Sequence, residues 1–393
     1  MTRYVTHDLA LAPSPGEAAA QDFVSTLRAH VLNDMAASMK ARYEQAVAPG
    51  LPAGATGPDV LEAMRPEPYF RFYSAARVKA QEMVWASVRA TVDRQGEELS
   101  ARAATLVADR ARASGTLSLN PGLAIPANVS DIDVHLMPGS YVHEDGEQDL
   151  AAGALYENGL SVFSFGLMGE TLDDIGRSIT LWLAARFPDF RPADILDLGC
   201  SVGHQTLPWA RTFPDARVTG LDVSAPCLRY AHARAQSLGL TAHFLQADAT
   251  AVPLPDASQD LVFSSMFLHE LPVADIRAVI GEAHRLLRPG GLMLHYELPP
   301  NEMLTAYDGF YLDWDSHFNA EPFYKGYRDL VPREEAGAAG FTQEDFLEAA
   351  IPSLGFHGED AVRAAAREGG AIGSDTLGRL ADGIRWYVWG AWK

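Results

Sequence analysis

The chain has 393 residues, of which 48% are hydrophobic and 21% are charged, and its formal net charge is −20 at pH 7. This composition is typical of a globular protein with two or three domains, and it excludes wholesale disorder, a collagen-like repeat and a disulfide scaffold. Because such an acidic chain repels phosphate backbones and anionic lipid headgroups, we expect neither nucleic acid nor a membrane as its partner.

The two cysteines, Cys200 and Cys227, are too few for a structural zinc site and are typical of a reducing compartment. The first residues contain no apolar segment of the kind that signal peptides have. No apolar run approaches the roughly 18–20 residues that a membrane-spanning helix needs. We therefore expect a soluble, cytoplasmic protein.

The first part of the chain has an almost purely helical pattern. Apolar residues recur at steps of three and four from Glu17 to about Val47, which predicts one amphipathic helix. The segment 49–58 is rich in glycine and proline and ends that helix. A short helix is expected at Asp59–Met64, and a long one from Tyr69 to about Ala113 in which Gly96 could introduce a break.

The segment 114–170 has weak periodicity, but it carries too many aromatic and histidine side chains for a plain linker. A helix from Leu172 to about Phe187 then leads into a different pattern. We divide the chain into a helical N-terminal cap or dimerisation domain (1–130), a connecting segment that contributes to the active site (131–190) and an α/β domain (191–393).

The α/β domain begins with short apolar strands that alternate with helices. The strand-like runs lie at 195–199, 217–223, 243–248, 260–267 and 291–298. Such an order indicates βαβ units and a doubly wound, mostly parallel sheet that is buried on both faces. Two late strands are expected near 341–352 and 384–393, and an insertion with a helical pattern separates them at 359–383.

The turn after the first of these strands has the composition of a ligand-binding loop. Asp197 is followed by Gly199, Ser201 and Gly203, and a helix comes next. Glycines at such a turn let the backbone approach a ligand, and they direct the helix N-terminus at it. Asp222 ends the next strand, where an acidic side chain can accept hydrogen bonds from a ribose diol. The nicotinamide fingerprint G-x-G-x-x-G is not met, because its middle position is serine.

From about Asp194 to Pro300 the sequence resembles the class I S-adenosylmethionine-dependent methyltransferases. The resemblance rests on the glycine turn, on Asp222, on Asp248 at the end of the third strand, and on the stretches DLVFSSMFLHEL and LLRPGGLMLHYE. The family usually has glycine where this chain has Ser201. The resemblance implies a seven-stranded sheet with an antiparallel edge pair, and S-adenosylmethionine as the cofactor of 191–393. The cofactor-binding residues that it implies are Asp197, Gly199, Cys200, Gly203, Asp222, Val223, Asp248, Ala249 and Ser265.

The methyl acceptor should approach the sulfonium at the carboxyl ends of the strands. His269 comes directly after the fourth strand and is our candidate for the base that accepts a proton. Tyr156 is our candidate for the side chain that closes the pocket over the sulfonium. Further candidates are Glu270, His295, Tyr296, Glu297, His317, His135, Tyr141, His143 and Asn158. Their spacing supports no metal site, and we expect none.

The leading hypothesis is methyl transfer to a small-molecule acceptor by in-line displacement at the sulfonium. One alternative is another reaction of the same cofactor, either aminocarboxypropyl transfer or an intramolecular cyclisation that releases methylthioadenosine. The other is a non-catalytic cofactor-binding protein on this scaffold. The sequence does not identify the acceptor, its reacting atom or the pathway. A homodimer is possible.

Overall fold

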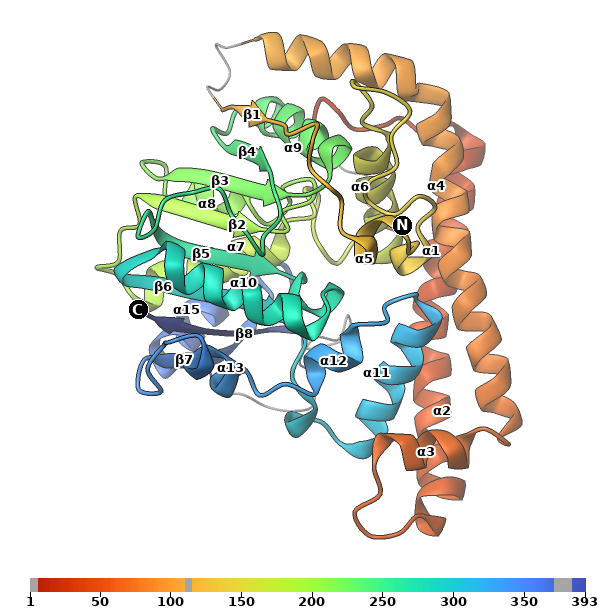
Figure 1. Ribbon diagram of the computed structural model, residues 1–393. Coiled ribbons are helices and arrows are strands. Elements are labelled where there is room, and N and C mark those ends of the chain that lie inside the picture. Colours follow the sequence, from red (N-terminus) through yellow and green to blue (C-terminus); the bar gives the residue numbers. More distant parts are fainter. Residues whose placement is uncertain (1–5, 110–114, 371–383) are drawn as a thin grey trace.

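The computed structural model describes residues 6–109, 115–370 and 384–393. Within these residues, an eight-stranded sheet of order β1-β4-β3-β2-β5-β6-β8-β7 forms the centre, with helices on both faces (Figure 1). The strands are β1 (Leu117–Ser118), β2 (Asp194–Leu198), β3 (Arg217–Asp222), β4 (His243–Gln246), β5 (Gln259–Ser265), β6 (Leu287–Glu297), β7 (Phe346–Pro352) and β8 (Arg385–Trp392). Strands β1 to β6 pair in parallel, and β8 pairs antiparallel with both β6 and β7.

Both faces of the sheet are buried because side chains alternate along each strand. Ile195 and Leu261 pack on one face, in a cluster that includes α7 (Asp174–Arg186) and α15 (Glu359–Glu368). Their neighbours Leu196 and Val262 pack on the other face, against α10 (Val273–Leu286). The predicted doubly wound α/β class is confirmed by this arrangement. The remaining helices of this part are α8 (Leu207–Thr212), α9 (Ala225–Ser237), η5 (Leu268–Glu270), η6 (Asn301–Met303), α11 (Ala306–Phe318), α12 (Tyr324–Arg328), α13 (Pro332–Ala338) and α14 (Leu354–His357).

The N-terminal helices form an antiparallel pair along one side of the molecule (Figure 1). The predicted first helix is a continuous rod made of α1 (Pro15–His30), η1 (Val31–Met35), α2 (Ala36–Arg42) and η2 (Tyr43–Val47), and η3 (Ala48–Gly50) follows. It starts at a capping box, in which Ser14 and Glu17 satisfy each other's backbone N–H groups. The partner helix α4 (Pro68–Ala108) follows α3 (Gly57–Met64).

One expectation for this region is wrong, and two others concern residues that the structure does not describe. Gly96 does not break α4, which is a single helix of 41 residues. The expected end near Ala113 lies outside the described residues, as does the part 371–383 of the predicted insertion. None of the helices in the described ranges is long and apolar enough to cross a membrane.

The segment 114–170 is more ordered than its sequence indicated. It supplies β1, which adds an eighth strand to the seven that the resemblance implied, and α5 (Ala127–Ser130) and η4 (Val134–Leu136). It also supplies α6 (Ala151–Phe163), which packs against α4 and α9. This segment therefore joins the N-terminal helices to the sheet.

Candidate active site

A cavity of about 700 Å³ lies between the carboxyl ends of the strands and the N-terminal helices. Most of the predicted site residues line it, namely Asp197, Gly199, Cys200, Asp222, Val223, Asp248, Ala249, Ser265, Tyr156 and His269. Gly203 does not line the cavity and lies in the turn behind it. The predicted cofactor residues and the predicted base thus face one shared space.

The β2–α8 turn has the backbone that the glycine motif requires. Gly199, Ser201 and Gly203 have φ angles of 68°, 46° and 78°, in the left-handed region that favours glycine. A Cβ atom on Gly199 would lie 2.2 Å from the Phe267 ring, so only glycine fits there. Ser201 adopts the left-handed conformation of the glycine that it replaces, and the turn is preserved.

Two carboxylates, Asp222 and Asp197, line the cavity at the predicted cofactor position. Asp222 accepts hydrogen bonds from the backbone N–H groups of Ser201 (2.8 Å) and Ser224 (2.9 Å), and burial raises its pKa to about 6. A carboxylate can accept about four hydrogen bonds, so capacity remains for a ribose diol. Burial likewise raises the pKa of Asp197, which accepts a bond from the Thr206 hydroxyl (2.6 Å), to about 7.

The remaining motif residues are explained by packing and local turns. Asp248 accepts hydrogen bonds from the backbone N–H (2.8 Å) and the hydroxyl (2.7 Å) of Thr250, which fixes the turn after β4. Burial raises the pKa of Cys200 well above its usual range. A thiol in that environment stays protonated and unreactive, so Cys200 fills space in the turn.

His269 is held by a carboxylate from the neighbouring strand. Its Nδ1 lies 2.6 Å from Oε2 of Glu297, at the end of β6, while Oε1 of Glu297 accepts the backbone N–H groups of Phe267 (2.8 Å) and Leu268 (2.6 Å). Burial alone would lower the pKa of His269, but Glu297 raises it to about 9. The other ring nitrogen, Nε2, lies 3.8 Å from Glu321.

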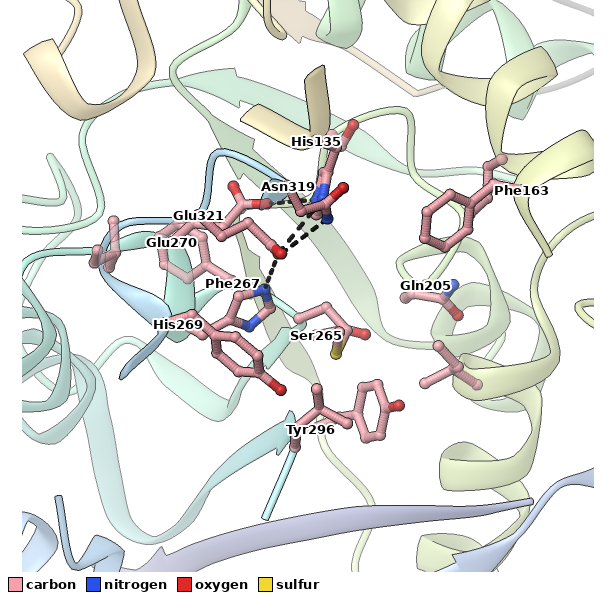
Figure 2. A pocket seen from close by; sticks show the side chains of 18 of the residues that line it. His135, Phe163, Gln205, Ser265, Phe267, His269, Glu270, Tyr296, Asn319 and Glu321 are labelled. Atoms are coloured by element: carbon pink, nitrogen blue, oxygen red, sulfur yellow. Dashed lines mark hydrogen bonds and ion pairs between the residues drawn. The ribbon is translucent and has the colours of Figure 1, made fainter. Parts of the chain in front are cut away.

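A second imidazole, that of His135, shares the Glu321 carboxylate with His269. His135 lies 3.4 Å from Glu270 through Nε2 and 3.4 Å from Glu321 through Nδ1, and Asn319 contacts the same Nδ1 at 2.9 Å. Tyr141 donates its hydroxyl to Glu270 (3.0 Å). Burial would lower the pKa of His135, but the two carboxylates raise it. Figure 2 shows this polar cluster above His269, with Phe163 and Gln205 at the right of the view.

Tyr156 presents its ring to the cavity from α6. The ring stacks on His204 with centroids 5.9 Å apart, and it meets Tyr141 edge-on at 5.4 Å. Burial raises the pKa of the Tyr156 hydroxyl, which keeps it neutral. An aromatic face held in this way is suited to contact a sulfonium.

Glu157, one residue further, ties this helix to three other segments. It is fully buried, pairs with His204 (3.0 Å) and His7 (2.9 Å), and accepts hydrogen bonds from Arg234 (2.8 Å) and Tyr230. Burial would raise the pKa of Glu157, but its partners lower it well below its usual range. The network links the N-terminus, α6, the β2–α8 turn and α9.

Four other sequence candidates, His295, His317, His143 and Asn158, do not line the cavity, whereas Tyr296 does. His295 is buried beside Ser264 (2.7 Å), and burial lowers its pKa to about 3. His317 and His143 are exposed. Asn158 binds the carbonyl of Ala154 within α6.

The sequence analysis missed the roles of Glu157, Asn319 and Glu321. The last two come shortly after His317 in the sequence, but nothing local distinguishes them from solvated polar residues. No group of His, Cys, Asp and Glu side chains in the described ranges has a geometry that could hold a metal ion.

A doubly wound sheet with an antiparallel edge pair, a glycine turn and acidic strand ends defines a nucleotide-cofactor-binding α/β domain. Residues 195–291 match the family model of a methyltransferase domain. The chain therefore carries a class I S-adenosylmethionine-dependent methyltransferase domain, and S-adenosylmethionine is the cofactor of that domain. The resemblance seen in the sequence is confirmed.

Two individual relatives each match about a third of the chain or less. The demethylmenaquinone methyltransferase of Thermus thermophilus is 38% identical over 109 residues, which are 28% of this chain and 49% of that protein. The trans-aconitate 2-methyltransferase of Methylobacterium radiotolerans is 39% identical over 119 residues, 30% of this chain and 43% of that protein. The chain thus spans about half the length of the curated relatives that it matches. Among solved structures, phosphoethanolamine N-methyltransferase 2 of Haemonchus contortus in complex with S-adenosyl-L-methionine is 17% identical, with a TM-score of 0.39, over 60% of this chain and 57% of that one.

Proposed function

We propose that this protein transfers the methyl group of S-adenosylmethionine to a small molecule that binds in the cavity beneath the N-terminal helices. The observation that carries the proposal is the shared cavity, which is lined both by His269 and by all the predicted cofactor residues except Gly203. Glu297 holds His269 in place through Nδ1. Demethylmenaquinone and trans-aconitate, which the names of two relatives give as acceptors, support a small-molecule acceptor.

S-adenosylmethionine supplies an electrophilic methyl group on its sulfonium. The backbone of the β2–α8 turn and the Asp222 carboxylate would hold its amino-acid and ribose parts. Tyr156 would cover the sulfonium, and the buried walls would exclude water. Most of the rate then comes from holding the donor and the acceptor at attack distance.

His269 would act when the acceptor must lose a proton. With Nδ1–H donated to Glu297, the lone pair of Nε2 is the one available for base catalysis. Because Glu297 raises the pKa of His269 to about 9, the imidazole is mostly protonated at neutral pH. Activity that depends on this base should therefore increase as pH rises toward 9.

The test is product analysis of the full chain incubated with S-adenosylmethionine, alone and with a panel of candidate acceptors. S-adenosylhomocysteine that forms only with an acceptor supports methyl transfer. Methylthioadenosine from the cofactor alone would favour aminocarboxypropyl transfer or cyclisation. Cofactor binding without any turnover would favour a non-catalytic binding protein.

A further inference from the structure

One buried cation at the wall of the cavity has no counter-ion. Four arginines in the described ranges are buried, and a carboxylate lies within 4.0 Å of three of them. Those ion pairs are Arg77 with Asp315 (2.7 Å), Arg234 with Glu157 (2.8 Å) and Arg328 with Asp313. The fourth, Arg28 of α1, is 1% exposed and has no carboxylate partner among the described residues. A buried charge without a partner is costly, so its presence calls for an explanation.

The contacts of Arg28 are all with neutral groups. Its Nε donates to the backbone carbonyl of Phe163 (3.1 Å), and its Nη1 donates to the side-chain oxygen of Gln81. The guanidinium carbon lies 3.8 Å from the centre of the Phe163 ring. The third nitrogen, Nη2, has no hydrogen-bond partner within the described ranges. Arg28 lines the cavity, so this nitrogen can serve a bound molecule.

The neighbouring residues do not neutralise Arg28. Arg77 donates to the same Gln81 oxygen (3.2 Å), and it engages both oxygens of Asp315, at 2.7 and 3.1 Å. The two guanidinium groups therefore share the neutral Gln81 oxygen, and the one carboxylate in contact with them, Asp315, pairs with Arg77 alone. One positive charge is left without a directly paired carboxylate. Burial and then Arg77 lower the pKa of Arg28 well below its usual range, and the nearby Asp315 offsets this only in part.

Arg28 lies at the acceptor end of the cavity. The Phe163 ring beneath its guanidinium is 6.4 Å from the His135 ring, which belongs to the polar cluster around Glu270 and Glu321. The partners of Arg28 come from α4 and from the end of α6, not from the turns after β2, β3 and β4. From Arg28 onward, one face of the α1–α2 rod lines the cavity with Leu32, Asn33, Ala36, Ala37 and Lys40.

We propose that Arg28 binds an anionic group of the methyl acceptor, a carboxylate or a phosphate, through its free guanidinium nitrogen, and that the mostly apolar face beyond it contacts the rest of the acceptor. That the bound anion is the methyl acceptor rests on the proposed function. Binding of an anion at Arg28 does not depend on turnover. An oxyanion would accept the bond that Nη2 now lacks and would neutralise the excess charge.

The experiment compares the Arg28→Met variant with the wild-type full chain. The probes are hexanoate and hexyl phosphate, with neutral hexanamide as the matched control, and binding is followed by calorimetry. We expect both anions to bind the wild type about 10- to 100-fold more tightly than the variant, since charged hydrogen bonds have this strength. Hexanamide should bind the two proteins equally. Arg42→Met, which removes an exposed arginine of the same rod, should change nothing.

Thermal unfolding without ligand separates this role from a structural one. Arg28→Met should be as stable as the wild type or more so, because it removes an uncompensated charge. Arg77→Met should be less stable, because it leaves the half-buried Asp315 without its partner.

Three outcomes would overturn the assignment. They are equal anion binding by the wild type and Arg28→Met, a large loss of stability in Arg28→Met, or a loss of S-adenosylmethionine affinity in that variant as large as the loss for hexanoate. The last outcome would assign Arg28 to the cofactor's own carboxylate. If Arg28-dependent anion binding is seen but no acceptor is methylated, the proposed function fails and the anion site stands.

Discussion

The pairing of Glu297 with His269 makes a pH-dependent prediction for stability. Glu297→Gln keeps a side-chain oxygen that can accept the backbone N–H groups of Phe267 and Leu268, but it removes the charge that faces Nδ1 of His269. The structure places the pKa of His269 at about 9, raised from 6.5. At about 1.4 kcal/mol per pH unit, that difference corresponds to about 3–4 kcal/mol of stability.

The sign follows from the direction of the shift. A group whose pKa is raised on folding contributes its full stabilisation below the unfolded pKa, near 6.5, and loses it as pH rises through about 9. Urea unfolding of the wild type and Glu297→Gln should therefore differ most near pH 6.5 and least near pH 10. A His269→Gln background should abolish the pH-dependent part of the difference. A constant difference between pH 6.5 and 10, or an NMR titration of His269 that stays near 9 in Glu297→Gln, would refute the reasoning.

Three other substitutions test the rest of the site. Asp222→Ala should weaken S-adenosylmethionine binding by about 1–3 kcal/mol, because the ribose hydroxyls lose a charged acceptor. Calorimetry on the folded variant would show an unchanged Kd if the ribose assignment were wrong. Glu157→Gln should lower the free energy of unfolding by about 3–5 kcal/mol, because it disrupts a fully buried ion network. A variant as stable as the wild type in urea would contradict this prediction. His269→Ala should lower turnover by about 10²–10⁴-fold with cofactor binding intact, whereas a loss below about tenfold would reduce His269 to a packing residue.

The sheet could be predicted because its strands are short apolar runs that are buried on both faces, with turn residues between them. The strand β1 could not, because it has only two residues and exists through its pairing with β4. Helix α6 was missed because Gly153 and Gly159 weaken a helical pattern. The structure explains both glycines by close packing, since added Cβ atoms would lie 2.6 Å from Tyr230 and 2.1 Å from Trp85.

In the candidate site too, some residues could be predicted from the sequence, whereas their partners depend on the fold. His269 could be proposed from its place after a parallel strand, but its partner Glu297 is the end of another strand and is found only when the two pair. The position of Arg28 in the sequence is itself unusual. It lies four residues after Val24 and three before Val31, on the predicted apolar face of its helix, where a charged residue is unexpected. Its burial depends on α4 and α6, which are remote in sequence. The proposed boundaries at residues 130 and 190 remain predictions.

The most direct test of the central claim, that one cavity joins the cofactor site to the acceptor site, is a crystal structure of the full chain with S-adenosylmethionine. We expect the ribose hydroxyls on Asp222, the sulfonium beside the Tyr156 ring, and the methyl group directed toward the open space bounded by His269 and Arg28. A cofactor bound with its methyl group toward solvent, or away from Asp222, would show that the two sites do not share this cavity.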